Sequence, residues 1–141
     1  MIMYADTSAL VKLVLDELGS DLAIDLWVSS PRVASSMLAF PEGCAALAAA
    51  SRSGRLDTAL YRHSLRSFEE TFAQLISIEV DERLALDAGE RAASFGLRGA
   101  DAVHLATALD LADEEVTFVT WDQALADAAA SAGLAVAGAP V

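Results

Sequence analysis

Residues 1–8 read Met-Ile-Met-Tyr-Ala-Asp-Thr-Ser, a short apolar run that ends in one carboxylate and two hydroxyls. Residues 9–15 then have the pattern of a helix, with Ser8 as its expected N-cap. A strand that passes directly into a helix is typical of an α/β fold, and such folds bind ligands at the carboxyl ends of their strands. Asp6 therefore belongs to a site only if other polar side chains arrive at the same end of the sheet.

The rest of the chain alternates between strand-like and helix-like segments. The expected strands are 2–5, 32–36, 74–80 and 116–120, with a short edge strand at 134–136. The expected helices are 9–15, 21–28, an alanine-rich segment that ends near 53–54, 57–72, 81–95, 100–112 and 122–133. Pro41 either starts the alanine-rich helix or kinks it. This alternation predicts one α/β domain over residues 1–141, with helices around a mainly parallel sheet of four to five strands.

Composition narrows the class of protein. Of the 141 residues, 55% are hydrophobic, which excludes an intrinsically disordered chain. A formal charge of −12 argues against a general basic surface for nucleic acid, but it suits a basic protein partner. No apolar run is long enough to span a membrane, and the first residues lack the basic stretch of a secretory signal. With a single cysteine, Cys44, expected in the core, the chain is expected to be cytoplasmic.

Four carboxylates lie where strands and helices meet. Asp6 follows the first strand, Glu42 lies just inside the helix after the second, and Asp122 follows the fourth. Because the strand-to-helix turns of such a sheet share one edge, these three are expected to lie together. Asp101 opens the helix before the fourth strand and joins them if that helix starts at the same edge. Each Asp is equally well explained as a helix cap. Glu42 has mostly apolar neighbours, so it is expected to be partly buried and to need a partner, and a snorkelling or arginine-paired residue explains it less well.

Carboxylates that converge repel one another unless a cation lies between them. Hard divalent ions such as Mg²⁺ prefer oxygen ligands and support in-line displacement at a phosphodiester. A zinc site is disfavoured, because the chain has one cysteine and only two histidines, His63 and His104. Such an ion also makes RNA an acceptable substrate for an acidic protein, because it neutralises the site locally.

Four segments contain the four acids: Ala-Asp-Thr-Ser-Ala-Leu-Val-Lys (5–12), Phe-Pro-Glu-Gly-Cys-Ala-Ala-Leu (40–47), Leu-Arg-Gly-Ala-Asp-Ala-Val-His-Leu-Ala-Thr-Ala (97–108) and Phe-Val-Thr-Trp-Asp (118–122). Together they resemble the PIN-domain ribonucleases, in particular the VapC-type toxins of bacterial toxin–antitoxin pairs. The resemblance covers essentially the whole chain, in order. It implies an α/β/α sandwich and a Mg²⁺- or Mn²⁺-dependent endoribonuclease.

The resemblance also implies the site and the partners. Asp6, Glu42, Asp101 and Asp122 match the acidic metal ligands, and Thr7 and Thr120 match hydroxyl residues beside the metal. The implied assembly is a homodimer, bound by a small VapB-like antitoxin whose C-terminal segment covers the active site.

Contacts to RNA phosphate are less defined. Arg98, Lys12 and Arg91 are candidates by their proximity in sequence to the acids, and each is equally well explained as a solvated surface charge. His104 fits a packed or hydrogen-bonded helix residue better than a catalytic base. Trp121 can stack on a base, although a role in anchoring its loop is favoured.

Other functions fit less well. A phosphotransfer receiver domain needs a lysine after a late strand, but Lys12 is the only lysine. An aspartyl-nucleophile phosphatase needs a second Asp two residues after the first, where this chain has Ser8. The alternative to an enzyme is a PIN-like module that only binds a basic partner protein. The sequence does not identify the RNA, the number of metal ions or the class of antitoxin.

Overall fold

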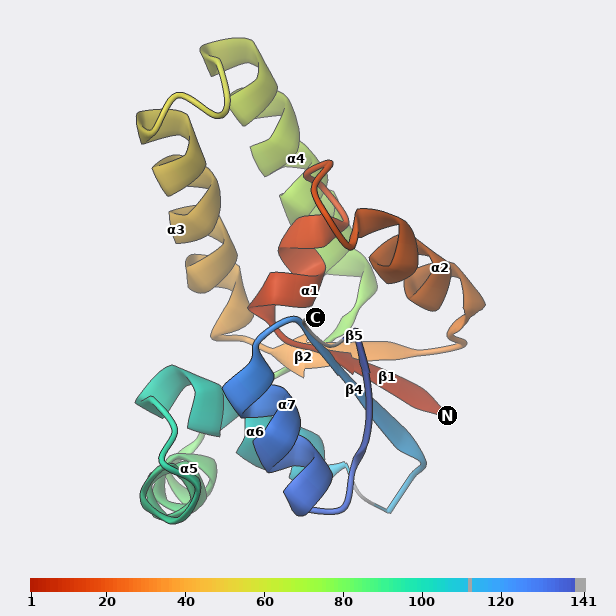
Figure 1. The fold of residues 1–141 in the computed structure, drawn as a ribbon, viewed down its shortest axis with the longest axis vertical. Helices are drawn as coiled ribbons and strands as arrows, with labels where there is room; N and C mark the ends of the chain where they lie inside the picture. Colours follow the sequence, from red (N-terminus) through yellow and green to blue (C-terminus); the bar gives the residue numbers. More distant parts are fainter. Residues whose placement is uncertain (112, 139–141) are drawn as a thin grey trace.

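A computed structural model describes residues 1–111 and 113–138 (Figure 1). Within these residues the strands are β1 (Ile2–Ala5), β2 (Val33–Ser36), β3 (Ile76–Ile78), β4 (Val116–Thr120) and β5 (Ala135–Gly138). The helices are α1 (Thr7–Lys12), α2 (Ser20–Ser29), α3 (Ala39–Arg52), α4 (Thr58–Gln74), α5 (Glu82–Phe95), α6 (Gly99–Asp110) and α7 (Gln123–Ser131). The expected α/β fold is confirmed.

All five strands run parallel, in the order β3-β2-β1-β4-β5. The central strand β1 pairs with β2 on one side and with β4 on the other. The chain therefore builds the sheet outward from β1 in two directions, and the order reverses between β1 and β4. In open α/β sheets the crevice at such a reversal, outside the carboxyl ends of the strands, is where ligands bind. The residues that follow β1 and β4 lie at this point.

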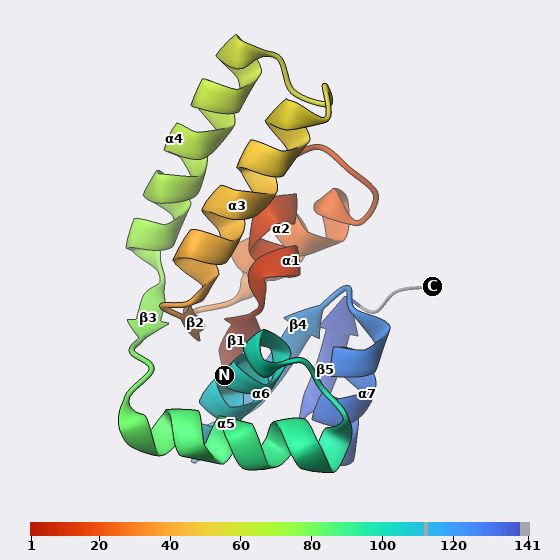
Figure 2. The same ribbon diagram turned by 90° about the vertical axis from the view of Figure 1, so that its left-hand side faces the viewer.

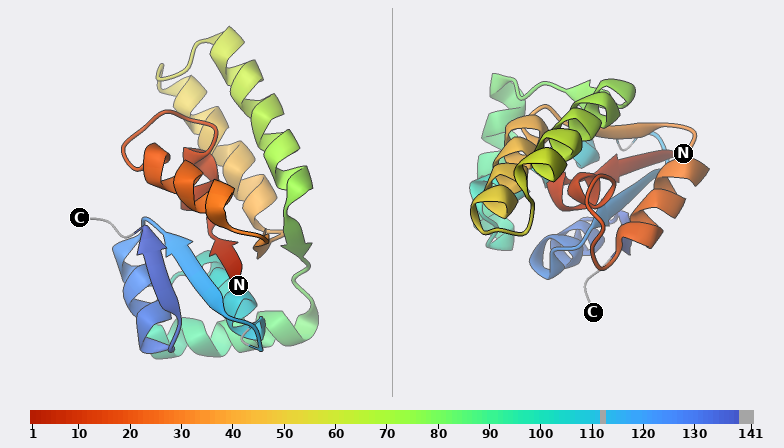
Figure 3. Two further views of the ribbon diagram at one scale, coloured as in Figure 1. Left: turned by 90° about the vertical axis from the view of Figure 1, so that its right-hand side faces the viewer. Right: turned by 90° about the horizontal axis from the view of Figure 1, so that it is seen from above.

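Helices cover both faces of the sheet, with α1 to α4 on one side and α5 to α7 on the other (Figures 1 and 2). Side chains alternate along β1, so Met3 and Ala5 pack under the first group while Ile2 and Tyr4 pack under the second. The long α3–α4 hairpin extends away from the sheet (Figure 3). Its two helices pack closely at Gly43 of α3, which lies against the ring of Phe68 of α4.

Several boundaries differ from the sequence prediction. Helix α1 begins at Thr7, because Asp6 and not Ser8 is the N-cap and accepts a hydrogen bond from Ala9 N. The prediction of Ser8 as N-cap is therefore wrong. Pro41 lies in the first turn of α3, where its missing N–H is not needed, so it starts the helix and does not kink it. The third strand is shorter than expected, and the expected end of the 100–112 helix lies outside the described residues.

The structure also bears on two expectations from composition, which concern membrane spans and Cys44. None of the helices in the described part of the chain is long and apolar enough to cross a membrane. Cys44 is a free thiol that packs against the edge of the core and remains partly exposed.

Candidate metal centre

Asp6 is buried at the end of β1, with 4% of its surface exposed. Its Oδ1 accepts hydrogen bonds from Ser8 Oγ at 2.6 Å and from Ala9 N at 3.0 Å. Its Oδ2 accepts one from Thr120 Oγ1 at 2.5 Å. Burial raises the pKa of Asp6, and the nearby His104 and these hydrogen bonds oppose that effect only in part. The carboxylate is thus fixed in position, and the unfavourable effect of burial on its charge is only partly offset by its neighbours.

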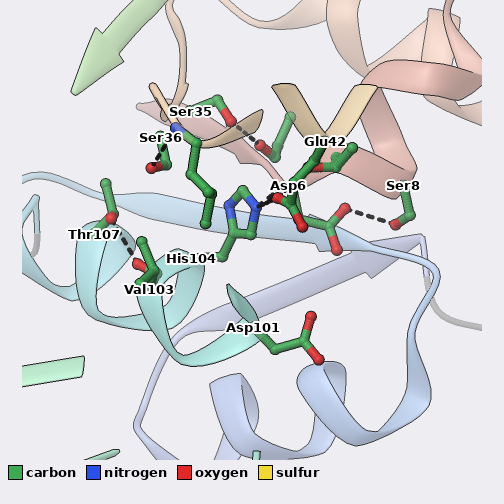
Figure 4. A network of polar contacts seen from close by, with 12 residues as sticks. Asp6, Ser8, Ser35, Ser36, Glu42, Asp101, Val103, His104 and Thr107 are labelled. Atoms are coloured by element: carbon green, nitrogen blue, oxygen red, sulfur yellow. Dashed lines mark hydrogen bonds and ion pairs between the residues drawn. The ribbon is translucent and has the colours of Figure 1, made fainter. Parts of the chain in front are cut away.

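Glu42 lies in the first turn of α3 and ends a chain of hydrogen bonds that begins in the core; Figure 4 shows its last two residues, His104 and Glu42. Its Oε1 accepts from Thr7 Oγ1 at 2.7 Å and lies 2.7 Å from His104 Nε2. The other ring nitrogen of His104, Nδ1, lies 2.8 Å from the hydroxyl of Tyr4. Tyr4 is fully buried and His104 is 2% exposed. Residues from β1, α1, α3 and α6 therefore meet at this one carboxylate.

The pKa values of Glu42 and Tyr4 reflect their burial and their hydrogen bonds. Partial burial raises the pKa of Glu42, but the hydrogen bonds from His104 and Thr7 outweigh it, and the nearby guanidinium of Arg98 acts in the same direction. The pKa of Glu42 is therefore below its ordinary value, and the group is a carboxylate at neutral pH. Burial, and next the charge of Asp6, raise the pKa of Tyr4, so its hydroxyl keeps its hydrogen.

Asp101 and Asp122 share a different counter-charge. Asp101 lies in the first turn of α6, and Asp122 is the N-cap of α7, where it accepts a hydrogen bond from Leu125 N at 2.9 Å. Arg98 donates from Nε to Asp101 Oδ2 at 3.0 Å, and its Nη2 lies 3.8 Å from Asp122 Oδ2. The Arg98 side chain is 81% exposed, so solvent screens both contacts. Its guanidinium is nevertheless the cation that sits between these two acids.

The turns after β1 and β4 are locked together by hydroxyl groups. Thr120 is fully buried, donates to Asp6 and accepts Asp122 N at 3.0 Å. Ser8 Oγ accepts Trp121 N at 3.0 Å. Because Thr120 at the end of β4 and Trp121 directly after it both donate to the turn after β1, Asp6 and Asp122 are held at the same edge of the sheet.

The remaining sequence candidates are held away from the acids. Lys12 is 12% exposed, pairs with Glu17 at 3.0 Å and lies 5.2 Å from the ring centroid of Trp121. The indole of Trp121 lies against Gly19 and Gly138, whose positive φ and lack of a Cβ make room for it. Trp121 thus anchors its loop. Arg91 pairs with Asp87 on α5.

The four acids do not converge on one point. In the positions that the side chains take here, no three His, Cys, Asp or Glu residues of 1–111 and 113–138 lie close enough together to hold a metal ion. Figure 4 shows Asp101 on the other side of Asp6 from Glu42. Apart from the imidazole of His104, which contacts Glu42 and Tyr4, the nearby groups able to bind a metal ion are carboxylate and hydroxyl oxygens, the ligand chemistry that Mg²⁺ and Mn²⁺ prefer. The donor set therefore fits such an ion, provided that the ion replaces Arg98 as the counter-charge of Asp101 and Asp122.

Comparison with known proteins decides the family. The sequence matches the PIN domain over residues 3–130. The chain belongs to the PIN-domain family. This PIN domain is 41% identical to Ribonuclease VapC49 of Mycobacterium tuberculosis, over 96% of this chain and 94% of the relative. It is 37% identical to Ribonuclease VapC46 of the same organism, over 95% of each chain.

Solved structures share the fold of this PIN domain. PAE2754 from Pyrobaculum aerophilum matches with a TM-score of 0.73 and 22% identity, covering 96% of this chain and 83% of that one. VapC20 of Mycobacterium tuberculosis, described as a toxin that cleaves the sarcin-ricin loop, matches with a TM-score of 0.68 and 17% identity, covering 94% and 95%. At these identities the likeness supports the fold alone.

Sequence reasoning misses three residues of this PIN domain's polar network. Ser8 is predicted only as a cap, whereas its bond to Asp6 connects two turns. His104 is predicted as a packed or hydrogen-bonded helix residue, and its contacts with Tyr4 and Glu42 confirm this. Its link to the site is not predicted, although its place three residues after Asp101 on the same helix puts both on one side of α6. Tyr4 is predicted only as part of a strand, whereas its hydroxyl reaches His104 from beneath the site.

Proposed function

We propose that this PIN domain is a metal-dependent endoribonuclease that acts as the toxin of a toxin–antitoxin pair. The proposal is supported by its 41% identity, over almost its full length, to proteins named Ribonuclease VapC. The observation that carries it is the edge of the sheet where Asp6 is buried and its pKa is raised, because burial outweighs its hydrogen bonds and the nearby His104. A buried carboxylate is costly, and a divalent cation removes that cost.

The proposed ligands are the four acids at this edge, with the two threonines in support: Asp6, Glu42, Asp101 and Asp122, with Thr7 and Thr120. When bound, Mg²⁺ or Mn²⁺ supplies positive charge for the phosphate oxygens of RNA and acidifies water. Thr120 and Ser8 orient Asp6, and Thr7 orients Glu42. These hydrogen bonds fix the oxygens before an ion arrives, which reduces the conformational entropy lost on binding.

Arg98 is the residue we propose for contact with RNA phosphate. Its guanidinium lies at the acids and is largely exposed, so it is free to turn outward when a metal ion takes its place. Lys12 can take this part only by leaving Glu17 and Trp121. We therefore assign Lys12 a smaller part, in stabilising the loop that follows α1.

The proposed partner is a small basic antitoxin of the VapB type. The structural neighbours include a complex named as a toxin–antitoxin complex from Klebsiella pneumoniae and VapBC2 from Rickettsia felis bound to a DNA fragment from its promoter. A chain with a formal charge of −12 attracts a basic peptide. We further propose that residues 1–141 form one PIN domain, that it is a homodimer, and that it acts in the cytoplasm, where its RNA substrate lies.

Cleavage of total cellular RNA tests this function. The wild type is expected to cleave RNA with Mg²⁺ or Mn²⁺ and to be inactive with a chelator. Asp6→Asn and Asp101→Asn are expected to lose at least about 100-fold in rate, since each removes a charge from the site. Asp87→Asn, on α5 and paired with Arg91, is the matched control and should cleave as the wild type does. Equal activity of all four proteins would defeat the site assignment.

One observation favours the alternative, a PIN module that binds a basic partner without catalysis. As the side chains lie here, no three acids in the described part of the chain close on one point. This alternative predicts no cleavage of any RNA with either metal, together with tight binding of the cognate basic antitoxin. The toxin hypothesis predicts cleavage that the same antitoxin suppresses.

A further inference from the structure

His104 links the core of the molecule to the acids at the sheet edge, although no cleavage chemistry requires it. It lies on α6, and its imidazole contacts Tyr4 of β1, Thr7 of α1 and Glu42 of α3. It is 2% exposed, so these contacts are made without competition from bulk water. Figure 4 shows the ring directed at Glu42 beside Asp6.

We propose that His104 is a positioning residue that fixes Glu42 for metal binding, and that Tyr4 in turn fixes His104. This inference rests on the proposed metal-dependent function and names a residue outside the set of ligands. The hydrogen-bond chain runs from Tyr4 through His104 to Glu42, with lengths of 2.8 and 2.7 Å.

The direction of each hydrogen bond follows from the donors and acceptors available. A carboxylate can only accept, so the hydrogen in the contact between Glu42 and His104 must sit on Nε2 of the ring. We assign His104 the neutral imidazole, in which Nδ1 keeps a free lone pair that accepts a hydrogen bond from the phenol hydroxyl of Tyr4. The hydroxyl of Tyr4 thus selects the ring tautomer that can hold Glu42.

The consequence for Glu42 is that one of its two oxygens is fully engaged. Oε1 receives both Thr7 Oγ1 and His104 Nε2, at 2.7 Å each, and the side chain is 30% exposed. Oε2 receives no protein hydrogen bond in the described part of the structure. Oε2 therefore remains available as a metal ligand. Removal of such an outer partner of a ligand lowers metal affinity by about 10- to 100-fold in other proteins.

The chain offers closely matched variants. His104→Gln keeps a side-chain N–H for Glu42 and a carbonyl oxygen for Tyr4, whereas His104→Leu has similar bulk and neither group. Tyr4→Phe removes only the hydroxyl, since the ring keeps its stacking on Phe118 at a centroid distance of 5.2 Å. Circular dichroism and urea denaturation of each variant establish that it is folded before binding is measured.

Nuclear magnetic resonance of the imidazole nitrogens tests the inference without metal. The chain has two histidines, and His63 on the exposed side of α4 is an internal reference in the same spectrum. We expect His104 Nε2 to carry a hydrogen and to change its shift in Glu42→Gln, while His63 does not change. An Nε2 without hydrogen, or an Nε2 signal that ignores Glu42→Gln, would overturn the proposal.

Titration with Mn²⁺ alone tests the effect on the metal. We expect His104→Leu to weaken Mn²⁺ binding at least about 10-fold, Tyr4→Phe to weaken it less, and His104→Gln to retain most of it. Equal Mn²⁺ affinity in the wild type and His104→Leu would overturn the positioning role. The role would also be overturned if His104→Gln lost as much Mn²⁺ affinity as His104→Leu. If the folded wild type binds no Mn²⁺, the proposed function fails, and the metal-free spectra still decide whether His104 holds Glu42.

Discussion

The hydroxyl of Thr120 donates a hydrogen bond of 2.5 Å to Asp6 Oδ2, although 114 residues separate the two along the chain. The same hydroxyl oxygen accepts Asp122 N at 3.0 Å. Because β1 and β4 are neighbours in the sheet, one buried side chain couples the turns that carry two of the proposed metal ligands. The stability of the fold and the position of these two proposed ligands therefore both depend on Oγ1 of Thr120.

Replacement of Thr120 should therefore destabilise the fold in proportion to the loss of its hydroxyl. Thr120→Val leaves Asp6 Oδ2 and Asp122 N without this partner and should lower the free energy of unfolding by about 1–3 kcal/mol. Thr120→Ser keeps the hydroxyl and should lose less, because only a methyl group is removed. Urea denaturation measures both, and a Val variant as stable as the Ser variant would contradict the coupling.

Asp6 should destabilise the protein when metal is absent. Its pKa is raised by burial, so its contribution to stability is fully present below the pKa of the unfolded chain and is lost as the pH rises through the higher pKa of the folded state. At neutral pH the buried charge is unfavourable. Asp6→Asn should therefore raise Tm without metal, by roughly 3–4 °C for each ~1 kcal/mol gained in a chain of this size.

Metal should reverse the order of Tm between the wild type and Asp6→Asn. Addition of Mn²⁺ should raise the Tm of the wild type, because a ligand that binds only the folded state stabilises it, and should change the variant little. Differential scanning fluorimetry at neutral pH measures the Tm of the wild type and of Asp6→Asn, each with and without Mn²⁺. A metal-free Asp6→Asn protein that melts below the wild type would show that the buried carboxylate is not a source of instability.

Two helical glycines should respond to alanine in opposite directions. A Cβ at Gly43 would overlap the ring of Phe68, so Gly43→Ala must push α3 and α4 apart and should lower the free energy of unfolding by about 1–3 kcal/mol. Gly89 on α5 has open space at that position, and Gly89→Ala should raise stability by about 0.5–1 kcal/mol through helix propensity. Chemical denaturation measures both variants, and two changes of the same sign would be inconsistent with this packing.

Arg98 should compete with the metal ion. Arg98→Gln removes the cation between Asp101 and Asp122, so Mn²⁺ should bind more tightly, by about two- to fivefold as expected for exposed ion pairs. The control is Arg91→Gln, which breaks an ion pair on α5 and should leave the affinity unchanged. Calorimetric titration at low salt measures both, and weaker binding by Arg98→Gln would mean that the arginine assists the metal.

Much of the fold is predictable from local sequence. The apolar runs that form β1 and β4, and the polar residues directly after them, are enough to place Asp6 and Asp122 at one edge of the sheet. Local rules could not choose between Asp6 and Ser8 as the N-cap, because the choice depends on Thr120 and Trp121 from the far end of the chain.

Long-range contacts explain the rest of what sequence could not provide. The bond between His104 and Glu42 spans 62 residues and depends on how α3 and α6, which cover opposite faces of the sheet, meet at its edge. The position of Arg98 before α6 predicts that it lies near the acids, but its pairing with Asp122 depends on where α7 starts. Pattern and spacing predict which residues reach an edge, and packing decides which of them touch.

Calorimetric titration of Mn²⁺ into wild type and Asp101→Asn tests the central claim most directly, because it asks whether this edge of the sheet holds a divalent cation. Asp110→Asn is the matched control, since Asp110 lies on the same helix and pairs with Arg83. We predict saturable binding by the wild type and Asp110→Asn, and at least about 10-fold weaker binding by Asp101→Asn. Equal binding by all three proteins, or no binding by the wild type, would contradict the account.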